Sequence, residues 1–170
     1  MLRECKIPDK MRTQPALLLD LDHTLFHTTT EDFKAHARPG LLLFLEEMAQ
    51  MFQLYVFTMG TRVYAHEKCT NLGITHFIPL SRIYAREDTT MVHGHHKKQF
   101  RRVLCEECVK HCIAVDDNPS YWNVPSFEMG EKVIQPRTVL RIKRFVYDGK
   151  NKDRELYKLA IFLKKHYSDI

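Results

Sequence analysis

Three short apolar runs, each followed by a polar residue, limit what this chain can fold into. The first spans Ala16 to Asp20, the second Leu54 to Phe57 before Thr58, and the third Cys112 to Val115 before Asp116. Each run is too short for a helix, and continuous apolar character is typical of a strand buried on both faces of a parallel sheet. We therefore expect these runs to be buried strands.

Segments with helical spacing separate the apolar runs. A helix is predicted to open at Arg38-Pro39-Gly40, with the proline in its first turn and Leu42, Phe44, Leu45, Met48 and Ala49 on its apolar face. Further helices are expected over Arg62 to Leu72, which ends before Gly73, over Lys97 to Cys105, and over residues 153–167. The last of these has Asp153 as its N-cap and places Leu156, Leu159, Ala160 and Leu163 on one stripe. This alternation predicts an α/β fold with a central, mostly parallel sheet.

Composition fits one globular domain over residues 1–170. The chain is 44% hydrophobic and 28% charged, which is enough apolar material for one sizeable core. No stretch approaches the roughly 20 apolar residues of a membrane helix, and no apolar signal segment begins the chain. Five cysteines, three of them crowded together, suit reduced thiols better than a disulfide framework. We expect a soluble intracellular protein that does not bind membranes.

Positive charge is concentrated at the carboxyl-terminal end. Residues 131–170 carry 11 Lys or Arg against 5 Asp or Glu, whereas residues 1–130 carry 15 against 16. Such a basic region suits an anionic partner, which includes a phosphorylated protein, nucleic acid or an acidic surface. A solvated basic face without a partner is an equally good interpretation.

Polar residues at the ends of the predicted strands indicate a shared crevice. In open parallel sheets, reactive groups gather beyond the carboxyl ends of the strands. Asp20 and Asp22 leave the same face of an extended chain, and Asp116 and Asp117 follow another strand. These carboxylates repel one another unless a cation lies between them, and Mg²⁺ prefers oxygen ligands.

The same residue types can perform phosphoryl transfer. One aspartate can attack phosphorus, while the other donates a proton to the leaving oxygen and later accepts one from water. Thr58 as a hydroxyl donor and Lys97 or Lys98 as a positive charge can hold the phosphoryl oxygens. An aspartate after a strand is also a common turn former, so the prediction depends on the combination of strand ends.

At these residues the sequence resembles the haloacid dehalogenase superfamily, whose phosphatases carry DxDxT, here Asp20-Leu21-Asp22-His23-Thr24. More narrowly, it is similar to the FCP-type phosphatases of the RNA polymerase II carboxy-terminal domain. The stretches that carry this narrower resemblance are "RPGLLLFLEEMAQMFQLYVFTMGTRVYA", "AVDDNPSYW" and "DRELYKLAIFLKKHY". The resemblance extends from about Leu17 onward and implies a three-layer Rossmann-like fold without a large cap.

The resemblance also implies roles for individual residues. Asp20 is the expected nucleophile that forms an aspartyl-phosphate, and Asp22 is the expected general acid and base. Mg²⁺ is expected to bind Asp20, the backbone carbonyl of Asp22 and the side chain of Asp117. The remaining expectations are that Asp116 supports Asp117, that Thr58 and Lys98 hold the phosphate, and that Thr24 braces the loop.

Other site residues are less well defined by the sequence. Lys98 is preferred over Lys97 because "KQFRRVL" has the better spacing, and Arg86 in "RIYARE" is expected in the wall of the active site. Arg62 is expected to pair with a second phosphate or an acidic side chain, unless it is simply a surface residue. Trp122 and Tyr121 are expected at the rim of the crevice, where they stack on a bound peptide, unless Trp122 anchors the core. His23 is expected either to touch substrate or to cap the loop.

A crowded group of cysteine and histidine residues allows two interpretations. Cys105, Cys108, His111 and Cys112 have the density of a zinc site, but the cysteine spacing also fits a buried helix face. No second half of a zinc motif accompanies them, and no BRCT-like domain is expected in this chain.

We therefore expect a Mg²⁺-dependent protein serine phosphatase that acts on the phosphorylated heptads of the RNA polymerase II tail in the nucleus. Docking partners from the transcription machinery are expected, and direct nucleic-acid binding is not. The alternatives are a phosphatase of small phosphometabolites, a phosphopeptide-binding module without turnover, and a zinc-stabilised nucleic-acid binder. The absence of a large cap favours a protein tail as substrate, and the preferred heptad serine stays open.

Overall fold

Six parallel strands form the central sheet of this protein. The structure, a computed structural model, describes residues 14–105, 111–130 and 136–167. The sheet has the order β5-β4-β1-β8-β10-β9, and every neighbouring pair is parallel. Its strands are β1 (Ala16–Leu19), β4 (Gln53–Phe57), β5 (Ile83–Tyr84), β8 (Cys112–Asp116), β9 (Ser126–Glu128) and β10 (Thr138–Arg141). The expected α/β fold with a mostly parallel sheet is confirmed.

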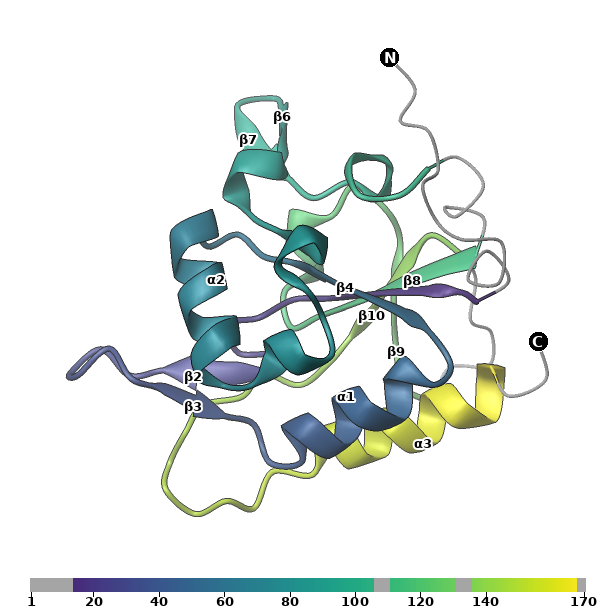
Figure 1. Cartoon of the computed structure of the whole chain (residues 1–170). Helices are drawn as coiled ribbons and strands as arrows, with labels where there is room; N and C mark the ends of the chain where they lie inside the picture. The colour runs from purple at the N-terminus through teal and green to yellow at the C-terminus, as the bar shows by residue number, and fades with distance from the viewer. Residues whose placement is uncertain (1–13, 106–110, 131–135, 168–170) are drawn as a thin grey trace.

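Three α-helices share one hydrophobic core with one face of the sheet. They are α1 (Leu41–Ala49), α2 (Arg62–Asn71) and α3 (Glu155–Tyr167), and α1 and α3 lie side by side (Figure 1). Alternate strand residues such as Leu17 and Val115 point into this core. The predicted stripe of the last helix is buried as expected, with Leu156, Leu159, Ala160 and Leu163 in the core.

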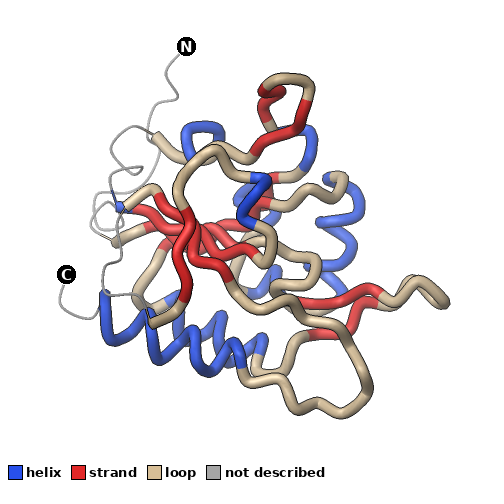
Figure 2. Tube along the Cα trace, turned by 180° about the vertical axis from the view of Figure 1, so that it is seen from behind, coloured by secondary structure: helices blue, strands red, loops and turns tan. Residues whose placement is uncertain are grey.

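The opposite face of the sheet is covered by short helical turns and loops. Leu18, Phe57 and Ala114 pack there against Phe100, Leu104 and Trp122. Figure 2, seen from behind, shows α1 and α3 along one side of the strands and short turns and loops on the other. The 3-10 turns that the structure describes are Ile74–His76, Leu80–Arg82, Arg86–Asp88, Phe100–Arg102 and Pro119–Tyr121.

Two small hairpins are the insertions between the elements of the sheet. One pairs β2 (Phe26–Thr28) with β3 (Ala35–Ala37), and the other pairs β6 (Thr90–Val92) with β7 (His95–Lys97). They project in different directions from the sheet (Figure 1). Within the described residues neither insertion forms a large cap, as expected. No described helix is both long enough and apolar enough to cross a bilayer.

The helix predicted over Lys97 to Cys105 is wrong. Lys97 ends β7, and only Phe100–Arg102 form a 3-10 turn. The backbone N–H of Lys98 donates to the carbonyl of Tyr121 at 2.8 Å, so the chain here is extended and paired with a distant segment. Pairing with that segment therefore overrides the local helical pattern.

The apolar face of α1 also differs from the prediction. Leu41, Phe44, Leu45 and Met48 are buried, whereas Leu42 is 48% exposed and Ala49 is exposed. The helix begins at Leu41, after Gly40 in a left-handed conformation with φ 82°, and therefore later than the expected start at Arg38-Pro39-Gly40. That start turns Leu41 toward the sheet and Leu42 toward solvent.

Candidate active site

The carboxyl ends of β1, β4 and β8 bring their polar residues to one edge of the sheet. Asp20 directly follows β1, Thr58 follows β4, and Asp116 ends β8. The register aligns Leu19 of β1 with both Val56 and Val115, so these three ends are level. A pocket of about 360 Å³ opens here and is lined by Asp20, Asp22, His23, Thr58, Met59, Gly60, Arg86, Asp117, Asn118, Tyr121 and Arg144.

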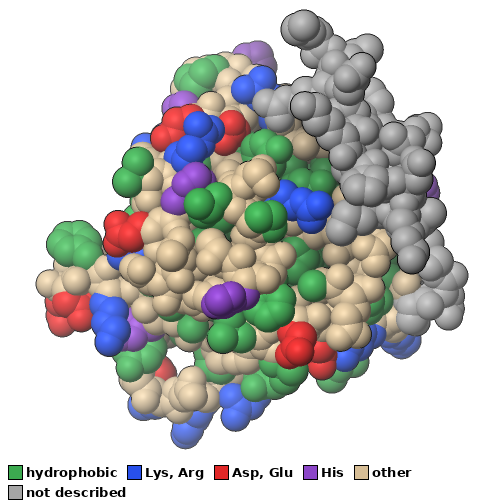
Figure 3. Space-filling model, in the orientation of Figure 1, with side chains coloured by type: hydrophobic (Ala, Val, Ile, Leu, Met, Phe, Trp, Pro, Cys, Tyr) green, Lys and Arg blue, Asp and Glu red, His purple; other side chains and the backbone are tan. Residues whose placement is uncertain are grey.

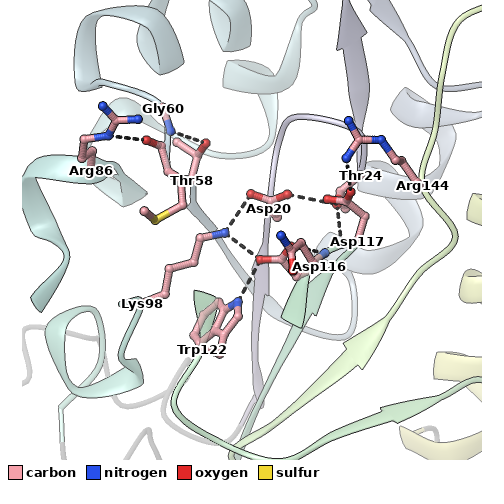
Figure 4. A network of polar contacts seen from close by, with 12 residues as sticks. Asp20, Thr24, Thr58, Gly60, Arg86, Lys98, Asp116, Asp117, Trp122 and Arg144 are labelled. Atoms are coloured by element: carbon pink, nitrogen blue, oxygen red, sulfur yellow. Dashed lines mark hydrogen bonds and ion pairs between the residues drawn. The ribbon is translucent and has the colours of Figure 1, made fainter. Parts of the chain in front are cut away.

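A buried lysine joins two of the aspartates. The Nζ atom of Lys98 lies 2.8 Å from Oδ1 of Asp20 and 2.7 Å from Oδ2 of Asp116. Lys98 and Asp116 are buried almost completely, and Asp20 is 6% exposed. Figure 4 shows the lysine reaching both carboxylates from the side of Trp122. The expected preference for Lys98 matches this geometry, because the Nζ of Lys97 instead donates to the carbonyl of Ser120.

Thr24 links the first aspartate to the fourth. Its buried hydroxyl lies 3.1 Å from Oδ2 of Asp20 and 3.4 Å from Oδ1 of Asp117, and it accepts the backbone N–H of Asp117 at 3.1 Å. One hydroxyl hydrogen cannot satisfy both carboxylates, so it is shared between them. Thr24 thus holds the loop after β1 against the loop after β8, in the position that the resemblance implies for it.

Burial raises the pKa of Asp20, Asp116 and Asp117, and one lysine does not balance all of their negative charge. Burial raises the pKa of Asp20, and Asp117 and Asp22 add to the rise against the opposing effect of Lys98. Burial also raises the pKa of Asp116 to about 6, with Asp20 adding to the rise, and burial and Asp116 raise the pKa of Asp117. Burial alone lowers the pKa of Lys98, but Asp20 and Asp116 outweigh it and keep the ammonium charged.

Three carboxylates are placed so that a metal ion fits between them. Asp20, Asp116 and Asp117 each offer an oxygen, and these atoms lie within 4.8 Å of one another. All the donors are oxygens, which suits a hard divalent cation, and such a cation would favour the ionised form of each carboxyl. No side-chain atom of Asp22 belongs to this group.

Asp22 instead forms a hydrogen bond with a tyrosine of α2. The Tyr64 hydroxyl donates to Oδ1 of Asp22 at 2.5 Å and lies 2.8 Å from Oγ1 of Thr28. Burial raises the pKa of Tyr64, and the bond to Asp22 adds to the rise, so the phenol keeps its hydrogen. Asp22 lines the pocket, and the hydrogen bond from Tyr64 orients its carboxylate there.

Thr58 and Arg86 form the opposite wall of the pocket (Figure 4). The buried Thr58 hydroxyl accepts the N–H of Gly60 at 3.1 Å, and the described residues give its own hydrogen no acceptor. Arg86 donates its Nε hydrogen to the carbonyl of Met59 at 2.9 Å. Both residues therefore lie where the sequence places them.

The position of Trp122 corrects one expectation. Its ring is 4% exposed and packs between Phe57 and Phe100, so it cannot stack on a bound peptide. The indole Nε1 donates to Oδ2 of Asp116 at 2.9 Å. The alternative interpretation, a tryptophan that anchors the core, is the one found.

Arg62 lies outside the pocket. Its guanidinium donates to the carboxylate of Asp88 at 2.9 Å, and its backbone N–H donates to Glu87. The sequence allowed either a second phosphate or an acidic side chain as the partner of Arg62, and in the structure the partner is the acidic side chain of Asp88.

Arg144 in the pocket and Tyr64 behind Asp22 were not assigned as site residues from the sequence, whereas Tyr121 was expected at the rim. Arg144 lies 3.5 Å from Asp117 and 2.8 Å from the ring of His23, Tyr121 lines the wall, and Tyr64 holds Asp22. The alternating basic residues of "LRIKRF" were the only sequence pattern that could have indicated Arg144. His23 does line the pocket, and its Nδ1 lies 2.9 Å from the carbonyl of Phe145.

The structure describes only part of the proposed zinc group. Cys112 lies buried within β8, where burial raises its pKa to about 12. Cys105, the last residue of the first described range, is half-buried. Cys108 lies outside the described residues. Since Cys112 belongs to a strand, the three cysteines do not share a helix face, and among described residues the metal-ligand geometry is found only at the aspartates.

A parallel sheet whose central strands deliver aspartates to a buried lysine is the arrangement of the haloacid dehalogenase superfamily. Residues 15–169 match the family described as NLI interacting factor-like phosphatase. Because this match covers most of the sequence, the chain belongs to that family.

Individual relatives agree with this assignment and show its breadth. The RNA polymerase II C-terminal domain phosphatase-like 4 of Arabidopsis thaliana is 29% identical over 62% of this chain and 31% of its own length. The protein TIM50 of the mitochondrial import inner membrane translocase, from Danio rerio, is 27% identical over 93% of this chain and 39% of its own. The chain thus spans well under half of these relatives.

The fold is shared with a solved phosphatase structure. The structure of Fcp1, an essential RNA polymerase II CTD phosphatase, superposes with a TM-score of 0.58 at 16% identity, covering 94% of this chain and 52% of that one. At this identity the likeness shows the fold.

Proposed function

We propose that this protein is a Mg²⁺-dependent protein serine phosphatase that acts on the phosphorylated heptad tail of RNA polymerase II. The observation that carries the proposal is Lys98, buried between Asp20 and Asp116 at 2.8 and 2.7 Å, beside an oxygen-only metal-ligand group. Burying such charges is costly, and a chain that needed only a stable fold gains little from them. The polymerase-phosphatase relatives supply the substrate class.

In the proposed reaction Asp20 is the nucleophile. Its carboxylate oxygen attacks phosphorus, the bond from phosphorus to the serine oxygen breaks, and Asp22 gives that oxygen a proton. Asp22 then takes a proton from water, the water oxygen attacks the phosphoryl group, and the acyl-phosphate bond breaks to release phosphate and restore Asp20.

Other side chains hold the phosphoryl group in line. Thr58 donates its unused hydroxyl hydrogen, Lys98 contributes a fixed positive charge, and Arg86 lies in the wall. Mg²⁺, held by Asp20, the backbone carbonyl of Asp22 and Asp117, would neutralise charge on the phosphoryl oxygens. Rigid placement on strand ends is what makes these groups effective.

The open pocket favours a protein tail over a small phosphometabolite. Short turns and loops that carry Arg86, Tyr121 and Arg144 line the pocket, and neither described hairpin is large enough to be a cap, so an extended chain can reach it. We also propose nuclear localisation, in line with the polymerase relatives, and an engagement with transcription-machinery partners. A fluorescent fusion in cells would test localisation, with accumulation in mitochondria as the opposing result.

The proposal is tested by phosphate release from serine-phosphorylated heptad peptides, with Mg²⁺ and with a chelator. We expect turnover only with Mg²⁺ and its loss in Asp20→Asn, whereas the matched surface variant Asp32→Asn keeps it. Asp32 lies exposed at the tip of the β2–β3 hairpin. Turnover that survives in Asp20→Asn would contradict the assigned nucleophile.

A binding module without turnover is the second candidate. The translocase relatives match 93 to 94% of the chain, a larger share than the polymerase phosphatases do. Phosphopeptide binding by a folded protein that releases no phosphate under any metal condition would support it.

A further inference from the structure

A second cavity adjoins the pocket that contains Asp20. Its volume is about 600 Å³, and Asp117, Asn118 and Arg144 line both cavities. The other walls come from Glu128 and Met129 at the end of β9, from Arg141 to Lys143 at the end of β10, and from Glu155 at the start of α3. The mechanism above uses none of these other residues.

The charged residues that line the second cavity are unevenly paired. They comprise three cations, Arg141, Lys143 and Arg144, and three carboxylates, Asp117, Glu128 and Glu155. Asp117 pairs with Arg144, and Glu155 pairs with Lys158 at 2.9 Å. In the part of the chain that the structure describes, neither Arg141 nor Lys143 forms a close ion pair, and the charge of Lys143 acts on Asp153 from a greater distance.

Arg144 forms the wall between the two cavities and is held in place. Its Nη2 lies 2.8 Å from Nε2 of His23, and Nη1 lies 3.5 Å from Oδ2 of Asp117. The Nδ1 of His23 faces the carbonyl of Phe145 at 2.9 Å, and because a carbonyl only accepts, Nδ1 carries the ring hydrogen and Nε2 accepts from Arg144. The Arg144 side chain is still 60% exposed, so the guanidinium hydrogens that these contacts leave over are available to a ligand.

The basic side chains of Arg141, Lys143 and Arg144 around the second cavity favour a negatively charged group on the substrate chain. Figure 4 shows Arg144 on the side of Asp117 away from Lys98. The guanidinium of Arg144 therefore lies next to the aspartates that are proposed to react, but in the described residues it is not one of the groups that contact Asp20. Basic side chains continue over the loop that leads into α3 (Figure 3). An extended peptide rises about 3.3 Å per residue, so groups a few residues apart can occupy both cavities.

We propose that the second cavity binds a second anionic group of the substrate, either another phosphoserine or an acidic side chain, near the phosphoserine being hydrolysed. This inference rests on the proposed function and defines its substrate class. Arg141 and Lys143 bind the anion, and Arg144 contacts the chain where it passes between the cavities. Arginine suits this role because its planar fork of donors matches phosphate and carboxylate geometry. Glu128 opposes the anion and limits its affinity.

The test uses peptides with one phosphoserine and a second position about two to five residues away on either side. That second position is serine, phosphoserine or aspartate, and kcat/KM is measured for each peptide. We expect a second phosphate to raise kcat/KM by about tenfold at one spacing, and aspartate to raise it less. Equal kcat/KM for all peptides would overturn the inference.

Charge variants test the assignment to this cavity. Arg141→Gln and Lys143→Gln should each reduce the preference for the doubly phosphorylated peptide, and Glu128→Gln should increase it. Lys165→Gln makes the same charge change at an exposed residue of α3 that lines neither cavity, and it should leave the preference unchanged. A preference that is the same in all four variants contradicts the inference. Circular dichroism checks that each variant is folded.

Failure of the proposed function can be recognised separately. Para-nitrophenyl phosphate and the singly phosphorylated peptide report turnover without the second group, so a protein inactive on both lacks the proposed function. Fluorescence anisotropy of the same peptides then tests the cavity by binding alone. Tighter binding of the doubly phosphorylated peptide that Arg141→Gln weakens supports the inference, and equal binding of both peptides overturns it.

Discussion

The hydroxyl of Tyr64 donates a hydrogen bond of 2.5 Å to Oδ1 of Asp22. Tyr64 lies in the first turn of α2, where its backbone N–H is capped by the Thr61 side chain at 3.4 Å. The capped start of α2 therefore positions the Tyr64 hydroxyl, and this hydroxyl in turn orients the carboxylate of Asp22, the proposed general acid and base. In the described residues no partner occupies the second oxygen of Asp22, which leaves that oxygen for the leaving group.

Replacing this tyrosine should slow turnover without preventing binding. We expect Tyr64→Phe to lower kcat by about tenfold with a small change in KM, because a freed Asp22 samples orientations that cannot transfer a proton. The pH–rate profile should change shape as well, which a purely structural defect would not cause. Val63→Ala, at an exposed position of the same helix, is the control. An unchanged kcat and pH profile in Tyr64→Phe would show that the hydrogen bond has no role in proton transfer.

Loss of Lys98 should destabilise the protein in a metal-dependent way. Lys98→Met leaves Asp20 and Asp116 buried without their cation, which we expect to cost about 3–5 kcal/mol of unfolding free energy. Mg²⁺ should recover part of this loss because it supplies positive charge to the same carboxylates. Urea unfolding with and without Mg²⁺ measures both effects. Lys97→Met is the control, and equal stability of the two variants would contradict the prediction.

Trp122 provides an optical measure of metal binding. It is the only tryptophan of the chain, and its indole donates to Asp116, one of the three clustered carboxylates. We expect Mg²⁺ to change its emission in a saturable way, because the ion alters the charge and hydrogen bonding of Asp116. Asp117→Asn removes one metal-ligand oxygen and should weaken this response at least tenfold. Titrations of fluorescence that coincide in the two proteins would exclude Asp117 as a ligand.

The sheet and the aspartates could be predicted because both depend on local sequence. Continuous apolar runs identified β1, β4 and β8, and parallel strands bring their carboxyl ends to one edge of the sheet. Asp20, Thr58 and Asp116 follow directly from that rule. Thr24 came from the resemblance and Lys98 from a choice between two adjacent lysines, and the structure places both beside the carboxylates.

The remaining features depend on contacts between segments that are far apart in the chain. Tyr64 is separated from Asp22 by 42 positions, and Arg144 from His23 by 121, so no spacing rule relates them. Trp122 could have been at the rim or in the core, and its neighbours Phe57 and Phe100 decide between these positions. The helix expected at Lys98 failed for the same reason, because pairing with Tyr121 overrides local preference.

A buried ion pair ties the candidate site to the last helix. The fully buried Arg38 donates to both oxygens of Asp153 at 2.8 and 3.0 Å, and to the carbonyls of Thr24 and Lys143 at 3.0 and 2.6 Å. One side chain thus joins the loop after β1, the loop that carries Arg144, and the segment that begins α3. Asp153 also accepts the N–H of Glu155 at 3.1 Å, which is the helix-capping contact that the sequence predicts.

The stabilisation from Asp153 should depend on pH in a defined direction. Burial alone would raise its pKa, but hydrogen bonds and the charge of Arg38 lower it below the ordinary 3.8. A carboxyl with a lowered folded pKa stabilises the protein above its unfolded pKa, and this stabilisation is lost as the pH falls through the folded value. We therefore expect Asp153→Asn to reduce the unfolding free energy by about 1–3 kcal/mol near neutral pH and by progressively less below pH 3.8. Urea unfolding across this range measures the difference. Asp148→Asn, exposed in the same loop, should differ from wild type by less than about 0.5 kcal/mol, and an Asp153→Asn difference that stays constant into acid would refute this account of the ion pair.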